Sequence, residues 1–280
     1  MTTELFTSSV LSLERDGHIA TLWLNRPAAS NAMGKDFWAD FPTALRLLDH
    51  DERVRVIIVA AKGKHFCAGL DLREMGPELL AGSGRNLESG EHPGLGNRYR
   101  TIVELQEAIS SVAKSNKPVI AAIHGACIGS GVDLISACDI RLSSEDATYS
   151  VREARLAIVA DLGSLQRLPH IIGAGHSAEL ALSAKDIDAH HAAQINLVND
   201  ALGDASAVYA RAKMLAEQIA SNAPAAVQGT KAVLRASIGQ SIEEGLAFVA
   251  QFNALHLDSN DLTEAITAYF EKRPPKFTGS

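Results

Sequence analysis

The stretch PVIAAIHGACIGSGVDL, residues 118–134, decides the fold that the sequence predicts. Its apolar run at 118–123 is typical of a strand covered on both faces, and the glycines that follow lead into a helical apolar run. The stretch VRVIIVAA at 54–61 has the same character and leads into HFCAGLDL at 65–72. Segments of helical period lie between the strands, at residues 34–49 and 99–114. This alternation predicts an α/β fold with mostly parallel strands.

Composition and charge narrow the class of protein. The chain has 280 residues, 46% of them hydrophobic, which suffices for one large domain or for a core with an appendage. The net charge of -7 and the isoelectric point near 5.8 argue against a nucleic-acid-binding protein, which would carry a basic face. Three cysteines without CxxC spacing favour a reduced compartment and argue against zinc, so we expect no metal site.

Neither a secretory signal nor a membrane span is expected. The opening MTTELFTSSV lacks the charged start and apolar run of a signal peptide, and the closing FTGS matches no targeting address. No apolar run approaches the roughly 20 residues that a spanning helix needs. We therefore expect a cytoplasmic protein that binds no membrane.

Two regions differ from the alternating pattern. Residues 76–98 contain six glycines and two prolines without a sustained period, which predicts a mobile loop that either flanks a ligand site or is an insertion without function. From residue 204 the pattern is helical, so we divide the chain into a core with the active site at 1–203 and a helical region at 204–280. Its expected capping residues are Asp204, Asn222, the pair Ser241 and Glu244, and the pair Asp261 and Glu264. The apolar faces of this region must pack on the core or on a second subunit.

Both glycine-bearing segments follow a strand at its carboxyl end, where open α/β sheets bind ligands. Glycine lets the backbone turn sharply there and leave amides unpaired. Two such amides aimed at one point form an oxyanion hole, although two tight turns without function would have the same composition. The segment at 124–134 is not a dinucleotide fingerprint or a P-loop, because it lacks both the GxGxxG order and a following GK[ST].

Three carboxylates accompany these segments: Asp133, Glu153 and Asp161. The last two lie in VREARLAIVADLG, residues 151–163, where an unpartnered buried carboxylate would be costly and would shift its pKa. Eight residues of helix would separate their Cα atoms by ~12 Å, and eight of strand by ~26 Å. The segment must therefore bend to bring both acids to one substrate, and Ala160 and Gly163 offer little steric resistance.

Each acid also has a purely structural interpretation. Asp133 opens a helical run, where the helix dipole favours an acid in the first turn. Glu153 has Arg152 and Arg155 nearby as ion-pair partners. Asp161 precedes LGSLQRL and would cap a helix that starts there.

Four segments, taken in order, resemble the enoyl-CoA hydratase/isomerase (crotonase) superfamily. They are LNRPAASNAM at 24–33, HFCAGLDL at 65–72, the long run at 117–173 and YFEKRPPKF at 269–277. The resemblance implies a crotonase-like core of repeated ββα units with a C-terminal helical region that drives formation of trimers, which often pair into hexamers. It also implies an acyl-CoA thioester substrate and no cofactor beyond the coenzyme A that the substrate carries.

The resemblance assigns two backbone amides to the thioester oxygen, on which charge gathers during the reaction. By motif position these belong to Leu70 and Ser130. Glycine is common where Ser130 stands, but an amide contact does not require glycine if φ is negative. The substrate-binding residues that the motifs imply are Ala68, Gly69, Leu70, Asp71, Leu72 and Ser130.

The three acids together are similar to those of the Δ3,5-Δ2,4-dienoyl-CoA isomerases. Hydratases of the family carry glutamates at the positions matching Asp133 and Glu153 and no acid where Asp161 stands. Phe37 and Trp38, shortly after NAM, favour the same assignment. The resemblance then implies that Glu153 takes a proton from C2, that Asp161 delivers one to C6, and that Asp133 polarises or orients. An apolar surround would keep Asp161 protonated near neutral pH.

Other functions stay open at this point. Asp133 and Glu153 could grip one water, as in a 2-enoyl-CoA hydratase. A thioester hydrolase, a dehalogenase and a catalytically silent acyl-CoA-binding subunit would use the same fold. We interpret three histidines as structural or surface groups: His124, His190 and His191. Three cations near the end of the chain could contact coenzyme A phosphates, but we interpret them as a solvated helix end: Lys272, Arg273 and Lys276.

Overall fold

The structure is a computed structural model that describes residues 2–80 and 95–280. Within these residues the larger sheet has seven strands, in the spatial order β1 (Thr3–Thr7), β2 (Leu11–Asp16), β3 (Ile19–Leu24), β4 (Val56–Ala61), β5 (Val119–Ile123), β7 (Ile140–Ser144) and β10 (Asp200–Leu202). Strands β1, β2 and β3 pair antiparallel, and every later pairing in this sheet is parallel. The expected α/β architecture with mostly parallel strands is therefore confirmed.

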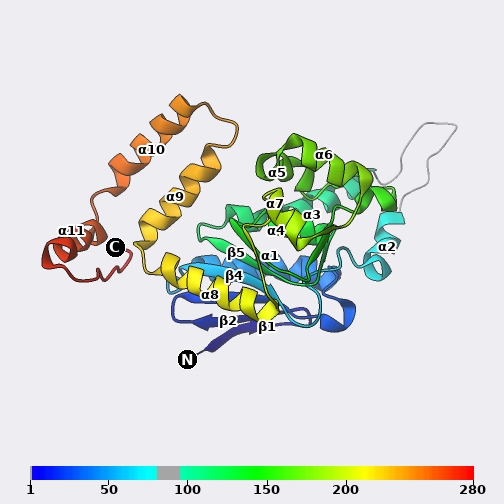
Figure 1. The fold of residues 1–280 in the computed structure, drawn as a ribbon, viewed down its shortest axis with the longest axis horizontal. Coiled ribbons are helices and arrows are strands. Elements are labelled where there is room, and N and C mark those ends of the chain that lie inside the picture. Colours follow the sequence, from blue (N-terminus) through cyan, green and yellow to red (C-terminus); the bar gives the residue numbers. More distant parts are fainter. Residues whose placement is uncertain (1, 81–94) are drawn as a thin grey trace.

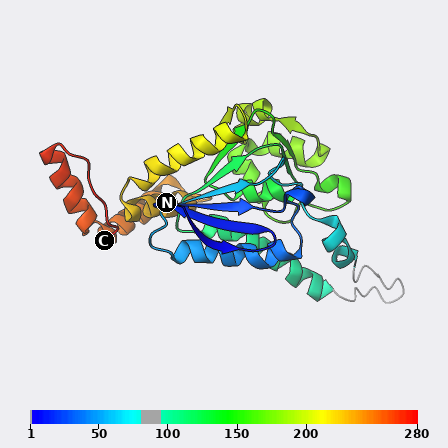
Figure 2. The ribbon, with the colours of Figure 1, turned by 90° about the horizontal axis from the view of Figure 1, so that it is seen from below.

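The apolar strand runs occupy the middle of this sheet because both of its faces are covered. All residues of β4 and β5 are buried. Alternate residues of β4 serve different cores: Ile57 and Val59 pack in the larger one, and Val56 and Ile58 pack in the smaller one. Helices α1 (Lys35–His50) and α3 (Leu95–Lys114) contribute to the larger core, and α8 (Ala205–Ala220) covers the opposite face (Figure 2).

A second, smaller sheet contains strands that shortly precede Asp133 and Glu153 in the sequence. Within the described residues it has three strands: β6 (Ala126–Ile128), β8 (Thr148–Ser150) and β9 (Ile187–Asp188). The remaining helices before α8 are η1 (Pro27–Ala29), α2 (Leu72–Leu80), α4 (Ser130–Ser136), η2 (Glu153–Leu156), α5 (Ser164–Ile171), α6 (Gly173–Ser183) and α7 (Ala189–Gln194). In the part of the chain that the structure describes, no helix is both long enough and apolar enough to cross a membrane.

Three helices continue beyond α8 and project from the core (Figure 1). They are α9 (Pro224–Ala236), α10 (Ile242–His256) and α11 (Asn260–Glu271). The division of the chain at residue 203 stays a prediction, and α8 lies past it although it packs on the sheet. Its buried residues repeat every four positions, as a helix that covers a sheet requires: Val208, Ala212, Ala216 and Ala220.

Two of the four capping predictions are confirmed and two are wrong. The Asp204 side chain caps α8, and Ser241 with Glu244 forms a capping box at the start of α10. The expectation for Asn222 is wrong, because Pro224 starts α9 and the Asn222 side-chain amide donates to the Gln218 carbonyl instead.

The capping box expected of Asp261 and Glu264 is also wrong. Ser259 caps α11 and accepts the Leu262 amide. Asp261 is instead buried, and its carboxylate accepts the amides of Thr278 and Gly279 from the end of the chain. Ser259 therefore caps this helix, while the Asp261 carboxylate holds the end of the chain in place.

Both ends of the loop predicted at 76–98 are helical instead. Residues 76–80 belong to α2, and residues 95–98 belong to α3. Glycine and proline obscured the helical pattern at these ends, yet Pro77 lies within α2. The rest of that prediction, at residues 81–94, lies outside the described residues.

Candidate active site

The first glycine turn, residues 65–72, follows β4 and is fixed by backbone hydrogen bonds. Met33 donates its amide to the Gly69 carbonyl at 2.8 Å and accepts the Asp71 amide at 3.0 Å. Leu70 lies between these paired residues, and its own amide has no acceptor among the residues that the structure describes. The turn therefore presents the Leu70 amide as a free donor.

The second glycine turn, residues 124–134, follows β5 and leads into α4. Gly129 adopts φ +53°, and its amide donates to the Ser150 carbonyl at 2.9 Å. Ser130 is the first residue of α4, where an amide has no intrahelical acceptor. Within residues 2–80 and 95–280 this amide has no other acceptor either. The φ of Ser130 is not positive, so the backbone there does not require glycine.

The two glycine turns touch. The Ile128 amide donates to the Cys67 carbonyl at 2.9 Å. A Cβ atom placed on Gly69 would lie 3.0 Å from the Ile128 carbonyl oxygen, and one placed on Gly129 would lie 3.3 Å from Oε1 of Glu153. Two free amides and one carboxylate thus meet in a single small region, as an oxyanion hole beside an acid/base requires.

A cavity of about 780 Å³ opens over this region. Its lining is mostly aliphatic and comes from the glycine turns, α2, α3, η2 and the segment after η2. Among the residues expected to act, those in the wall are Ala68, Gly69, Leu70, Leu72, Ser130, Glu153 and Asp161. Asp71 is not in the wall: it is buried, pairs with Arg26 at 2.8 Å and receives the Arg73 amide in the first turn of α2.

Asp133 lies behind the cavity wall. It is only 1% exposed, and its Oδ1 accepts the Ser164 amide at 2.6 Å. Its Oδ2 has no hydrogen-bond partner within the described part of the chain. Burial raises the pKa of Asp133 to about 6, although the Ser164 hydrogen bond and the nearby charge of Arg167 oppose the shift. Asp133 is thus the carboxylate that receives an amide at the start of α5.

Glu153 begins η2 and points toward the second glycine turn. The ion pair expected from its neighbours does not form, because Arg152 pairs with Asp186. Its Oε2 is buried and has no partner among the described residues. Burial, followed by the negative charge of Asp133, raises the pKa of Glu153 to about 7. A carboxyl group that titrates near neutrality is suited to take and return protons.

Asp161 lies in the acid segment, defined here as residues 157–163. The chain turns before Asp161 at Ala157, with φ +57°, rather than at Ala160, and it turns again after Asp161 at Gly163, with φ +119°. The structure assigns no cap to Asp161, because Gly163 precedes α5 and Asp133 receives the Ser164 amide. Burial raises the pKa of Asp161, which is the direction that a proton donor needs.

The apolar surround expected for Asp161 comes only in part from its own segment. Leu156 is 46% exposed and Val159 is 74% exposed. The neighbouring helix α3 supplies Ile102 and Leu105 to the cavity wall. Gln106 on the same helix donates its side-chain amide to the Asp161 carbonyl at 2.7 Å. Sequence reasoning missed Gln106, because no local pattern relates it to a residue 55 positions away.

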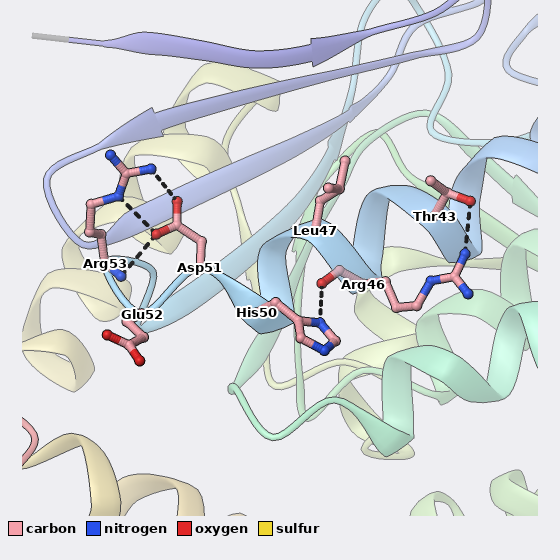
Figure 3. Close-up of a pocket in the computed structure, with 7 residues that line it drawn as sticks. All are labelled: Thr43, Arg46, Leu47, His50, Asp51, Glu52 and Arg53. Carbon is pink, nitrogen blue, oxygen red and sulfur yellow. Dashed lines mark hydrogen bonds and ion pairs between the residues drawn. The ribbon is translucent and has the colours of Figure 1, made fainter.

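A second hollow lies at the end of α1 (Figure 3). Its lining residues are Thr43, Arg46, Leu47, His50, Asp51, Glu52 and Arg53. The Asp51 carboxylate is taken by Arg53, and His50 Nδ1 lies 2.8 Å from the Arg46 carbonyl oxygen. These groups are paired with one another, so the hollow lacks the converging free groups of the first cavity.

Two of the other candidates, His124 and Arg273, have structural partners. His124 is buried, with Nε2 2.9 Å from the Gly63 carbonyl oxygen. Arg273 pairs with Glu264 at 2.6 Å and with Glu271 at 2.6 Å. Neither of them lines the cavity over the glycine turns.

Comparison with known proteins supplies the family. Residues 14–280 match the model described as enoyl-CoA hydratase/isomerase. The chain is 45% identical, over 99% of both proteins, to an Arabidopsis thaliana protein named Delta(3,5)-Delta(2,4)-dienoyl-CoA isomerase, peroxisomal. It is 43% identical to a Dictyostelium discoideum protein named as the mitochondrial form, over 92% of this chain and 87% of that protein. The solved structure of an enoyl-CoA hydratase from Bacillus anthracis matches 97% of this chain and 100% of its own, with TM-score 0.86 and 29% identity.

The chain belongs to the enoyl-CoA hydratase/isomerase family. The family resemblance and the crotonase-like fold inferred from the motifs are thereby confirmed. The expectation of a cytoplasmic protein is wrong, because the two relatives are named peroxisomal and mitochondrial. Composition and charge reflect the exposure of a folded chain to water, and the interior of an organelle is aqueous like the cytosol. They therefore do not distinguish the two compartments.

Proposed function

We propose that this protein isomerises 3,5-dienoyl-CoA to 2,4-dienoyl-CoA. One observation carries the proposal: Asp161 shares a cavity wall with Glu153 and with the two glycine turns. Moving a double-bond pair along an acyl chain needs a proton acceptor at one end and a donor at the other. The names of the relatives at 45% and 43% identity support the same reaction.

The reaction balances with these groups alone. The Glu153 carboxylate removes the C2 proton, and the electron pair moves into the conjugated system and onto the thioester oxygen. The amides of Leu70 and Ser130 donate to that oxygen while it carries charge. Asp161 then gives its proton to C6. This leaves Glu153 protonated and Asp161 ionised, and exchange with solvent restores both, so no cofactor is required.

Asp133 acts from behind the wall in this scheme. Its negative charge contributes to the raised pKa of Glu153. Its hydrogen bond to the Ser164 amide ties the helix that follows the acid segment to α4. We assign it an orienting and polarising role rather than contact with the acyl chain, because it is 1% exposed.

A 2-enoyl-CoA hydratase is the second candidate, and one observation favours it. Oδ2 of Asp133 and Oε2 of Glu153 are both buried without a partner among the described residues. Two such oxygens would hold one water for addition to a double bond. In that reaction Asp161 would have no chemical step.

The deciding experiment is Asp161→Asn, assayed with 3,5-dienoyl-CoA and with 2-enoyl-CoA in parallel. Asparagine keeps the shape of the side chain but has no acidic proton to give, so we expect isomerisation to fall at least about 100-fold. Asp200→Asn removes an exposed carboxylate far along the chain and serves as the matched control. Undiminished isomerisation by Asp161→Asn would overturn the proposal, and hydration as the faster wild-type reaction would favour the second candidate.

We also propose that the protein assembles as a homotrimer or homohexamer through its projecting helices. In α10, which lies wholly within the described residues, no side chain is buried. The large apolar residues exposed on α10 and α11 are Ile242, Leu246, Leu255, Leu262, Ile266, Tyr269 and Phe270. Single chains seldom leave so much apolar surface in water. Sedimentation should give a mass three or six times 29.7 kDa, and a monomer would contradict this proposal.

A further inference from the structure

The middle of the acid segment, around Asp161, lacks the backbone pairing that fixes its surroundings. Among the described residues, no amide from residues 159–163 donates to a backbone carbonyl. The ends of the acid segment differ from its middle: the Ile158 amide donates to the Glu153 carbonyl, and the Gly163 carbonyl accepts the amides of Gln166 and Arg167 in α5. The position of Asp161 must therefore be set by side chains.

Those side chains come from one face of α3 and from α5. Gln106 donates to the Asp161 carbonyl at 2.7 Å. Arg167 donates to the Leu162 carbonyl at 3.3 Å and, through its other nitrogen, to the Ser110 hydroxyl at 2.9 Å. Gln106 and Ser110 are four residues apart, so they lie on the same face of α3. Ile102, one turn earlier on that face, lines the cavity.

We propose that Gln106 is a positioning residue that sets where the Asp161 carboxyl lies in the cavity. The inference rests on the proposed function, in which Asp161 delivers the C6 proton. Gln106 bonds to the carbonyl of the very residue that carries this carboxyl. Because the amides of residues 159–163 donate to no backbone carbonyl within the described residues, loss of that bond frees the Asp161 backbone to move. A misplacement of about 1 Å costs on the order of 100-fold in rate.

This role predicts a selective defect. Glu153 and the amides of Leu70 and Ser130 are held by other elements, so removal of the C2 proton should not depend on Gln106. Gln106→Met replaces the side chain by one of similar length that cannot donate. In deuterated water we expect C2 hydrogen exchange to stay within about threefold of wild type, and formation of the 2,4-diene to fall about 10- to 100-fold.

Two further variants complete the test. Gln106→Asn keeps the amide but is one methylene too short to reach, so the same selective loss is expected if Gln106→Met folds poorly. Glu107→Gln, next along α3 on its exposed side, is the matched control and should behave as wild type. Equal loss of exchange and isomerisation would show a merely structural residue, and no loss of either would show that Gln106 does not position Asp161. Both results overturn the inference.

The outcome for Asp161→Asn separates this inference from the function beneath it. If Asp161→Asn loses isomerisation while Gln106→Met does not, the reaction stands and the positioning role fails. If Asp161→Asn isomerises at the wild-type rate, the proposed function fails, whatever Gln106→Met does.

Discussion

The two glycine turns and the acid segment line the same cavity but are held in place differently. The turns are fixed by backbone hydrogen bonds, as those from Met33 to Gly69, from Cys67 to Ala126 and from Gly129 to Ser150. The acid segment is held by the side chains of Gln106 and Arg167. Backbone bonds can form with almost any sequence, whereas side-chain bonds depend on particular residues.

The difference separates two tasks. Stabilising charge on a thioester oxygen needs donors that do not move, and rigid turns supply them. Placing a second acid at a chosen distance along an acyl chain needs a segment whose course a few substitutions can alter. We infer that a change of residues 157–163 and their contacts would change the reaction while leaving the turns and the fold intact.

The strongest test of the glycine turns is the variant Gly69→Ala. Gly69 adopts φ +95°, and a Cβ there would lie 3.0 Å from the Ile128 carbonyl oxygen. The turn must shift, and the Leu70 amide moves with it. We expect isomerisation and C2 exchange to fall together by about 100- to 1,000-fold, the cost of losing an oxyanion donor. Steady-state and exchange assays check this, and loss of isomerisation alone would contradict it.

Gly175→Ala is the matched control for that change. Gly175 lies in α6 without positive φ, and a Cβ there would meet nothing within 4 Å. Alanine in an open helical position should raise the free energy of unfolding by about 0.5–1 kcal/mol and leave both rates unchanged.

The next prediction concerns the free energy of unfolding, which the buried carboxyl group of Glu153 lowers as it ionises. Its pKa is about 7 in the folded protein against 4.5 for the free side chain. A folded-state pKa above the unfolded value means that the native state binds the proton more tightly, so stability falls as pH rises from about 4 to 7. Glu153→Gln removes this loss. We expect it to raise the free energy of unfolding by about 2–3 kcal/mol at pH 8 and by nearly nothing at pH 4.

Glu264 supplies a control of opposite sign. Its pairing with Arg273 lowers its pKa to about 2, so the ionised form favours the folded state above the unfolded pKa. Glu264→Gln should therefore lower the melting temperature at pH 8, with the difference vanishing as pH falls toward 2. Thermal unfolding across pH measures both variants, and a Glu153→Gln gain that did not depend on pH would rule out titration as its cause.

The contrast between turns and segment also explains what the sequence could predict. Strands β4 and β5 and the turns after them are local patterns: apolar runs followed by glycine. The bend before Asp161 is not, because it depends on Ala157 in a left-handed conformation that alanine seldom adopts. Gln106 and Arg167 were missed for a related reason, since their importance comes from tertiary contacts. The structural role expected of Asp161 at the start of α5 belongs to Asp133, because only the fold shows which carboxylate meets the Ser164 amide.

The smallest expected effect comes from Ala157→Gly. This variant removes a Cβ at a positive φ, whereas Gly69→Ala introduces one. Ala157 adopts φ +57°, a conformation that costs a residue with a Cβ about 1–2 kcal/mol. Glycine removes that strain but gains about 0.4–1 kcal/mol of unfolded-state entropy. We therefore expect a net stabilisation within about 1 kcal/mol and isomerisation within about threefold of wild type, because Gln106 still holds the Asp161 carbonyl. A large loss of isomerisation would mean that the bend at Ala157, and not the α3 contact, determines where Asp161 lies.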